Sequence, residues 1–265
     1  MRIDCHLHLP VREELISFDD KKQCLLKALQ ANNIDYGIVI PDNVKDSPIG
    51  NLHQCIDLFK DEKHIFLMAS VNILGAQQSR LQEFNELLKN KDIVALKIFP
   101  GHDEHLPNDE RLIPFIELCL TYYTPFVIHT GQNIGNSEAA RWNDPKYIVD
   151  LANNYPQLKI VICHYYWPYL QYCYEVTRGY KNINYDVSGL ADIQVERIIG
   201  KQKAKEILEK TISDNPESVL FGSDFGGSDI NPHIQLIESL DISNELREMV
   251  FSSNARNLFL LPIEN

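Results

Sequence analysis

The sequence predicts an α/β fold, a (β/α)₈ TIM barrel formed by residues 1–265 as a single domain. Eight short apolar or β-branched runs occur in order, and stretches with helical periodicity separate most of them, as expected for parallel βαβ units. The chain has 265 residues, and ~250 residues is typical of this barrel. An open doubly wound sheet would carry a glycine-rich turn after its first strand, and the sequence has none there.

The strands are expected at residues 2–8, 36–40, 65–71, 93–99, 125–129, 159–163, 183–188 and 218–223. Apolar residues at helical spacing mark the helices, and the clearest stripes are Leu25, Leu26 and Leu29; Leu81, Phe84, Leu87 and Leu88; Ile113, Phe115, Ile116, Leu118 and Cys119; and Ile148, Val149, Leu151 and Ala152. Barrel enzymes build their active sites from the loops after the strands. We therefore expect the loops Pro100–Pro107 and Gly131–Pro145 to border an active site.

Composition and charge exclude several classes of function. A formal net charge of −12 argues against a nucleic-acid or anionic-membrane partner, because both need a basic surface. The six cysteines are scattered and form no Cys-x-x-Cys pair, so neither a disulfide framework nor a thiolate zinc site is expected. We find no signal-peptide pattern and no apolar run of membrane-spanning length. The expectation is a cytoplasmic protein acting on a small-molecule substrate, with a homo-oligomer left open.

The residues that point to chemistry begin with His6 and His8, on the first apolar strand. Alternate residues of a strand point to the same face, so the two imidazoles are expected side by side, as half of a transition-metal site. His129, His164 and Asp224 lie at the ends of later apolar runs, which places them at the carboxyl-terminal mouth of the predicted barrel. Histidine nitrogens and one carboxylate suit Zn²⁺, and Mn, Fe, Co or Ni would accept similar ligands.

Several longer motifs contain these residues and occur in a specific order. They are Ile3-Asp4-Cys5-His6-Leu7-His8, Val127-Ile128-His129-Thr130-Gly131, Tyr155-Pro156-Gln157-Leu158-Lys159-Ile160-Val161 leading to His164, Tyr185-Asp186-Val187-Ser188-Gly189, Phe221-Gly222-Ser223-Asp224 and Asn254-Ala255-Arg256-Asn257-Leu258-Phe259. In these motifs, nearly end to end, the chain resembles the amidohydrolase superfamily. It is most similar to the amidohydrolase-2 branch, which is related to metal-dependent decarboxylases of the aminocarboxymuconate-semialdehyde type.

The resemblance implies one divalent metal ion, zinc by expectation, held by His6, His8, His129 and Asp224, with His164 beside it. Such an ion lowers the pKa of its bound water toward ~7 and polarises a carbonyl oxygen. Asp224 would accept the proton of the water and pass it to the leaving group, and His164 would steady the water or the developing oxyanion.

Four further residues are candidate substrate contacts. Lys97 is a charge inside an apolar strand, and a buried lysine needs a partner or a role. It is expected to contact a substrate carboxylate or pair with an acid. The alternative is a carboxylated lysine between two metals, as in two-metal members of the superfamily. Arg12 is a second candidate for anion binding, with a solvated loop position as the alternative. Tyr166 and Trp167 follow His164, where the family often has glycine, so they either line the pocket or pack against the next helix.

The function expected from these residues is metal-dependent hydrolysis of a C–N or C–O bond in a small amide, ester or lactone, which can bear a carboxylate. A non-oxidative decarboxylase of a small carboxylic acid is the alternative, because the same ligands serve both chemistries. A barrel that keeps a metal for structure alone is a third interpretation. The loop-lined mouth disfavours it, because structural metal sites are normally closed.

Overall fold

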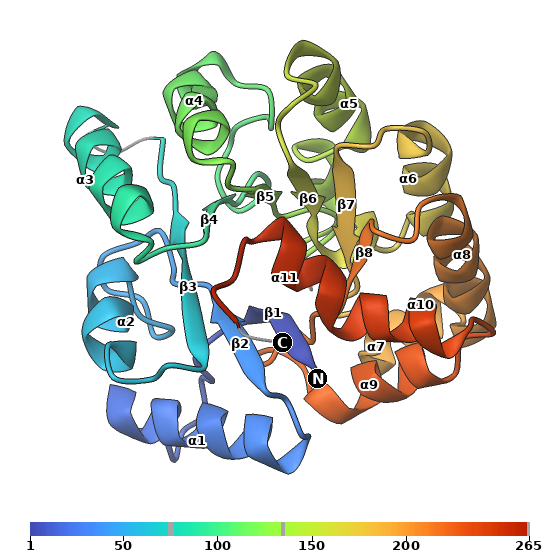
Figure 1. The fold of residues 1–265 in the computed structure, drawn as a ribbon, viewed down its shortest axis with the longest axis horizontal. Helices are drawn as coiled ribbons and strands as arrows, with labels where there is room; N and C mark the ends of the chain where they lie inside the picture. The colour runs from blue at the N-terminus through green and yellow to red at the C-terminus, as the bar shows by residue number, and fades with distance from the viewer. Residues whose placement is uncertain (74–76, 134–135, 264–265) are drawn as a thin grey trace.

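The structure, a computed structural model, describes residues 1–73, 77–133 and 136–263 and is a parallel eight-stranded β-barrel surrounded by helices (Figure 1). The strands follow one another around the barrel in sequence order. They are β1 (Ile3–Leu7), β2 (Tyr36–Val39), β3 (Ile65–Ser70), β4 (Ala95–Ile98), β5 (Phe126–Ile128), β6 (Ile160–Ile162), β7 (Ile183–Asp186) and β8 (Val219–Leu220). The predicted TIM barrel is confirmed, and each expected strand is present but shorter than its apolar run.

The barrel closes where β1 meets the segment that follows β8. Backbone hydrogen bonds run from Cys5 N to Phe221 O at 2.9 Å and from His8 N to Phe225 O at 2.7 Å. A third joins Asp224 N to His6 O at 2.9 Å. The first strand and the segment after the last strand are therefore joined beside the candidate metal ligands.

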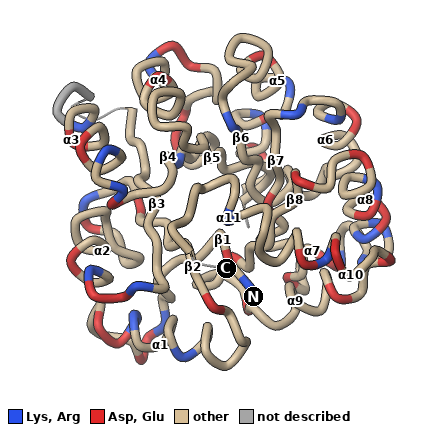
Figure 2. Tube along the Cα trace, viewed as in Figure 1, with Lys and Arg blue, Asp and Glu red and all other residues tan. Residues whose placement is uncertain are grey.

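Helices form the outer layer of the barrel in Figure 1. They are α1 (Phe18–Ala31), α2 (Leu52–Phe59), α3 (Gln77–Asn90), α4 (Ile113–Tyr122), α5 (Pro145–Asn154), α6 (Leu170–Thr177), α7 (Ile193–Ile199), α8 (Lys201–Asp214), α9 (Ile230–Glu238) and α10 (Asn244–Glu248). The last helix, α11 (Asn254–Leu258), lies across one end of the barrel instead. Ser17, Asn51 and Asp144 are the N-caps that precede α1, α2 and α5, and each side chain accepts a hydrogen bond from a backbone N–H of the first turn. Figure 2 shows that most charged residues lie on this outer ring.

The core has two parts because strand residues alternate between the two faces of the sheet. One cluster lies between the barrel and its helices and includes Leu25, Leu29 and Phe84 from the predicted helix stripes. The other fills the barrel interior, where Cys5 and Val161 meet residues of α11. Figure 1 shows α11 lying across the end of the barrel at which both chain termini are found. None of the helices in the described ranges is long and apolar enough to cross a membrane.

Two loops at the opposite end of the barrel are tied together through Asn143. Its side chain accepts a hydrogen bond from Gly131 N at 2.9 Å and donates to Pro100 O at 2.8 Å. These loops are the ones expected to border the site, except that residues 134–135 of the second lie outside the described residues. Gly131 has a φ of 86°, and a Cβ there would stand 2.3 Å from Trp167 O. Only glycine fits this close approach of two backbones.

Replacing Gly131 by alanine should therefore destabilise the barrel more than replacing a glycine that has a similar backbone but open surroundings. Gly179, with a φ of 96° and no heavy atom within 4 Å of its Cβ position, is the matched control. Gly179→Ala should cost about 1–2 kcal/mol for its left-handed backbone alone. Gly131→Ala should cost about 2 kcal/mol more, because the new methyl group overpacks against Trp167. Urea unfolding of both variants measures the difference, and equal losses would contradict the crowding argument.

Candidate metal centre

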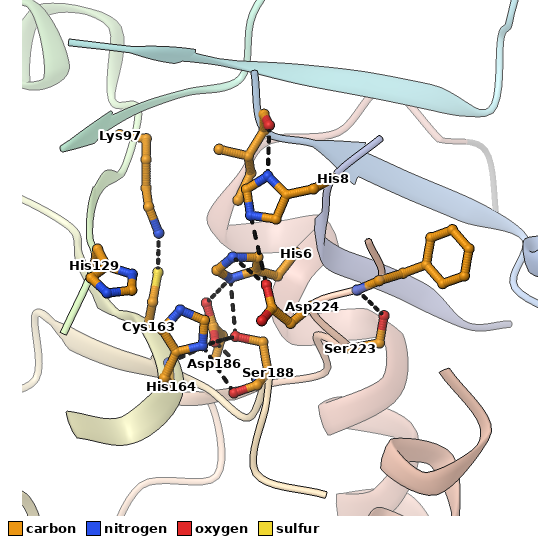
Figure 3. Close-up of polar contacts among 12 residues, drawn as sticks. His6, His8, Lys97, His129, Cys163, His164, Asp186, Ser188, Ser223 and Asp224 are labelled. Carbon is orange, nitrogen blue, oxygen red and sulfur yellow. Dashed lines mark hydrogen bonds and ion pairs between the residues drawn. The ribbon is translucent and has the colours of Figure 1, made fainter. Parts of the chain in front are cut away.

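His6, His8 and Asp224 converge at the carboxyl-terminal end of the barrel (Figure 3). Their placement follows from the β1–β8 closure, which sets Asp224 beside the end of β1. The Nε2 atoms of His6 and His8 lie 3.5 and 3.6 Å from the same oxygen, Asp224 Oδ1. Ligand atoms around a tetrahedral ion with bonds of ~2.1 Å stand roughly 3.4 Å apart. The distances from Asp224 Oδ1 to the two Nε2 atoms are therefore those expected between ligands of one ion.

The other ring nitrogen of each imidazole has a hydrogen-bond acceptor, which fixes the tautomer. His6 Nδ1 donates to Asp186 Oδ2 at 2.9 Å, and His8 Nδ1 donates to Ile40 O at 2.9 Å. His164 Nδ1 donates to Ser188 O at 3.1 Å. Metal-binding histidines almost always donate their second N–H to a carboxylate or carbonyl in this way. The donor chemistry therefore fits a divalent transition metal bound through the Nε2 atoms.

Burial keeps these imidazoles in the neutral form that binds metals. Desolvation lowers the pKa of His6 to about 4 and that of His8 and His164 to about 3. Burial also raises the pKa of Asp224 to about 7, with the nearby Asp186 carboxylate adding to the rise. The Asp224 side chain keeps 26% of its surface exposed, so one side of this carboxylate opens to the cavity that it lines.

Two of the candidate residues have left-handed backbone conformations. His164 has a φ of 57° and Asp224 a φ of 61°, and Tyr165 and Tyr166 continue the left-handed stretch after His164. Non-glycine residues held in this region cost about 1–3 kcal/mol each and cluster at functional sites. Side-chain hydrogen bonds hold the stretch in place, from Tyr166 Oη to Ala140 O at 3.0 Å and between the hydroxyls of Tyr165 and Thr211.

His129 follows β5 as expected but lies apart from His6 and His8, with no contact drawn to either (Figure 3). Its Nε2 lies 2.8 Å from Asn133 Oδ1, and its ring centre lies 4.9 Å from that of His164. Donor atoms of His6, His164 and Asp224 all lie within 4.8 Å of one another. Among the five candidate ligands, His164 is thus drawn into the converging group and His129 stands at its edge.

A second group of donor atoms lies deeper in the barrel and comprises His6, Cys163 and Asp186. All three residues are buried, and the Lys97 ammonium donates to Cys163 Sγ at 2.6 Å. Asp186 is already saturated, since its Oδ1 accepts from His164 N at 3.0 Å and Ser188 N at 3.1 Å. The group around Asp224 borders a cavity, whereas Cys163 and Asp186 do not line that cavity. The residues around Asp224 are therefore the candidate catalytic centre.

Of the four candidate substrate contacts, only Trp167 lines the cavity beside the candidate metal centre. This cavity measures about 320 Å³ and is lined by Trp167 together with His129, His164 and Asp224. Tyr166 is buried and does not line the cavity. Lys97 is fully buried on β4 with its ammonium 5.4 Å from the centre of the Phe99 ring. Arg12 is exposed on the loop after β1. Neither cation lines the cavity.

A larger cavity, of about 380 Å³, lies elsewhere on the molecule. It is lined by residues of α6 and α8, among them Tyr174 and Asp214, and by none of the candidate ligands. Size alone therefore does not locate the site, and the converging donors do.

Two important residues were missed by the sequence reasoning. Asp186 ends β7, and its carboxylate accepts from His6 Nδ1 and from the backbone of His164 and Ser188. Burial raises the pKa of Asp186, but the His6 ring and its hydrogen bond, together with the nearby His164 and Lys97, outweigh burial and hold this pKa well below its usual range. Ser188 Oγ lies 3.0 Å from His6 Nδ1 and 2.9 Å from His164 Nδ1. Their position at the end of a strand, like that of the histidines, was the available signal.

We expect Asp186 to be a positioning residue, because its contacts are with His6 and the backbone of His164. Asp186→Asn places an amide N–H against a ring or backbone N–H, so the His6 ring should lose its fixed orientation. Metal affinity should fall by about 10–100-fold, the usual effect of losing such a partner. Titration with a competing chelator measures the metal dissociation constant, and the exposed Asp150→Asn is the control. Unchanged affinity with a lowered unfolding temperature of the metal-free protein would show a merely structural role.

Comparison with solved structures identifies the same barrel in other proteins. An uncharacterized TIM-barrel protein from Bordetella bronchiseptica aligns with a TM-score of 0.79 and 16% identity, covering 98% of each chain. A protein assigned as a 2-pyrone-4,6-dicarboxylic acid hydrolase from Pseudomonas putida aligns with a TM-score of 0.73 and 16% identity over 99% of this chain and 98% of its own.

A dihydroxybenzoic acid decarboxylase from Polaromonas sp. JS666, with bound manganese and the inhibitor 2-nitroresorcinol, aligns with a TM-score of 0.69 and 15% identity. The alignment covers 99% of this chain and 98% of that one. At these identities the likeness shows the fold alone. Comparison with curated proteins found no match. The family model Amidohydro_2, described as Amidohydrolase, matches residues 3–261, so the chain belongs to the amidohydrolase family.

Proposed function

We propose that this chain is a metal-dependent hydrolase that cleaves a C–N or C–O bond in a small-molecule amide, ester or lactone. The observation that carries the proposal is the approach of His6 Nε2 and His8 Nε2 to one oxygen of Asp224, at 3.5 and 3.6 Å. These atoms are the donors of a zinc-type site. They lie beside a cavity, which leaves room for a substrate and a water.

The proposed ion is held by His6, His8 and Asp224, with His129 as fourth ligand on the basis of the family resemblance. We propose zinc, and manganese is the alternative favoured by the manganese in the structurally similar decarboxylase. When bound, such an ion lowers the pKa of water toward ~7 and polarises a carbonyl group.

The protein groups around the cavity supply the remaining steps. Asp224 accepts the proton of the attacking water and returns it to the leaving group, since its carboxylate lines the cavity in which that water would stand. His164 steadies the attacking water, because its unprotonated Nε2 accepts a hydrogen bond while Nδ1 donates to Ser188 O. Trp167 covers one side of the cavity and reduces the access of bulk water.

A decarboxylase is the second candidate, favoured by the structural likeness to the dihydroxybenzoic acid decarboxylase. The two reactions differ in their products. Screening the metal-replete protein against lactones, esters, amides and aromatic acids in ¹⁸O-labelled water should give a product that contains solvent oxygen, without release of carbon dioxide. Carbon dioxide release from an aromatic acid without oxygen incorporation would establish the decarboxylase instead.

The metal content of purified protein tests the centre itself. After reconstitution with zinc and removal of excess metal, elemental analysis should find about one ion per chain. His6→Ala and Asp224→Asn should each lose the ion and the activity, whereas His64→Ala, at an exposed histidine, should lose neither. Full metal content in both site variants would place the ion elsewhere. A content near two would support a carboxylated Lys97 between two metals.

The roles of His129 and His164 are separated by a pair of matched variants. With three ligands in His6, His8 and Asp224 and a fourth in His129, a fifth close imidazole would block the open position that a catalytic ion needs. His164→Asn should therefore keep its metal and lose ~10²–10³ in turnover, whereas His129→Asn should lose metal. Loss of metal in His164→Asn and its retention in His129→Asn would contradict this assignment. His164 would then be the fourth ligand, as its closer approach to His6 and Asp224 would allow.

A further inference from the structure

The cavity beside the candidate metal centre has an acidic wall. Of the residues that line it, Asp192 and Asp224 are the acids, and none in the described part of the chain is lysine or arginine. The remainder of the wall is neutral or aromatic and includes Gln132, Trp167 and Ser228. Because Asp224 is assigned to the metal, a substrate in this space meets the Asp192 carboxylate beyond the metal position and no lysine or arginine of the described chain.

The two cations that a substrate carboxylate was expected to meet are placed elsewhere. The Lys97 ammonium lies in the barrel interior and donates to Cys163 Sγ at 2.6 Å. Arg12 is exposed on the loop after β1, and neither residue lines the cavity. A carboxylate in this space could be balanced only at the metal itself.

Asp192 offers an acceptor on the cavity wall. The residue is half-buried where α7 begins, and its Oδ1 accepts from Gln194 N at 2.7 Å. Its Oδ2 makes no hydrogen bond to the described residues. Gln132 Nε2 donates to Tyr169 Oη at 2.9 Å, which leaves the Oε1 atom of Gln132 as a further acceptor. These two oxygens are acceptors, and acceptors select hydrogen-bond donors.

We propose, on the basis of the proposed hydrolase function, that the substrate carries an amine or hydroxyl group toward Asp192 and no carboxylate there. An ammonium group could form an ion pair with Asp192 and a cation–π contact with the ring of Trp167. A carboxylate would meet a like charge without a counter-ion, and such a contact lowers affinity for the wrong ligand. The substrate class is therefore an amine- or hydroxyl-bearing amide, ester or lactone.

The test uses three benzohydroxamic acids that share the metal-binding hydroxamate and differ at the para position. The para groups are aminomethyl, hydroxymethyl and carboxylate. Calorimetric titration of the zinc-loaded protein should give affinities for the first two that exceed the third by about tenfold, the scale of one like-charge contact at a partly exposed site. The readout is binding, so it does not depend on finding the natural substrate.

Asp192→Asn should bring the hydroxymethyl and carboxylate compounds closer in affinity, because it removes the charge and keeps the shape. Glu196→Gln is the matched control, since Glu196 is exposed on the same helix and does not line this cavity. It should leave the affinity ratio at the wild-type value.

Tightest binding by the carboxylate, an affinity ratio unaffected by Asp192→Asn, or no binding by any of the three compounds would overturn the inference. The expected affinity order without hydrolysis of any amide, ester or lactone would overturn the proposed reaction and leave the charge preference standing. The two claims therefore fail through different measurements.

Discussion

The structure depends most on the closure of the barrel between β1 and the segment after β8. The His6 carbonyl accepts from Asp224 N, and His8 N donates to Phe225 O. Asp4 reinforces the same seam, because its Oδ1 accepts from Ser223 N and from His6 N, both at 3.1 Å. Residues from the two ends of the chain are joined here, and the carboxylate of Asp224 reaches both imidazoles only because the seam is closed.

A second constraint on the site is the buried carboxylate of Asp186. Asp186 receives hydrogen bonds from the His6 ring and from the backbone of His164 and Ser188, so β1, β6 and β7 meet at one carboxylate (Figure 3). A buried carboxylate with its lone pairs occupied is stable where an unpaired one would be costly. It also fixes which ring nitrogen of His6 remains available at the cavity. The left-handed backbone at His164 and Asp224 shows that local strain is tolerated where these contacts hold the chain.

Much of this could be predicted from the sequence, because strand alternation and the ends of apolar runs are local features. The eight strands, the placement of His6 and His8 side by side, and the position of Asp224 at the barrel mouth follow from such patterns. Strand ends were overestimated, since apolar runs such as residues 218–223 continue past the hydrogen-bonded strand Val219–Leu220 into the residues that close the barrel.

Contacts that need several strands at once could not be predicted. The pattern indicated that Lys97 is buried, but its contact with Cys163 depends on the pairing of β4 with β5 and of β5 with β6. The sequence could not predict which of His129 and His164 lies nearer to Asp224, because a single side-chain rotation moves an imidazole by several ångströms. The charge of the cavity wall likewise depends on which loop residues face inward, and Asp192 was not distinguished from the other acids.

X-ray absorption spectroscopy of the zinc-loaded protein tests the central claim most directly, because it reads the atoms that touch the metal. The centre built on His6, His8 and Asp224 predicts a first shell of nitrogen and oxygen alone, at ~2.0–2.2 Å. A sulfur scatterer at ~2.3 Å would contradict it, since the ion would then lie in the buried group of His6, Cys163 and Asp186 rather than at the open mouth of the barrel.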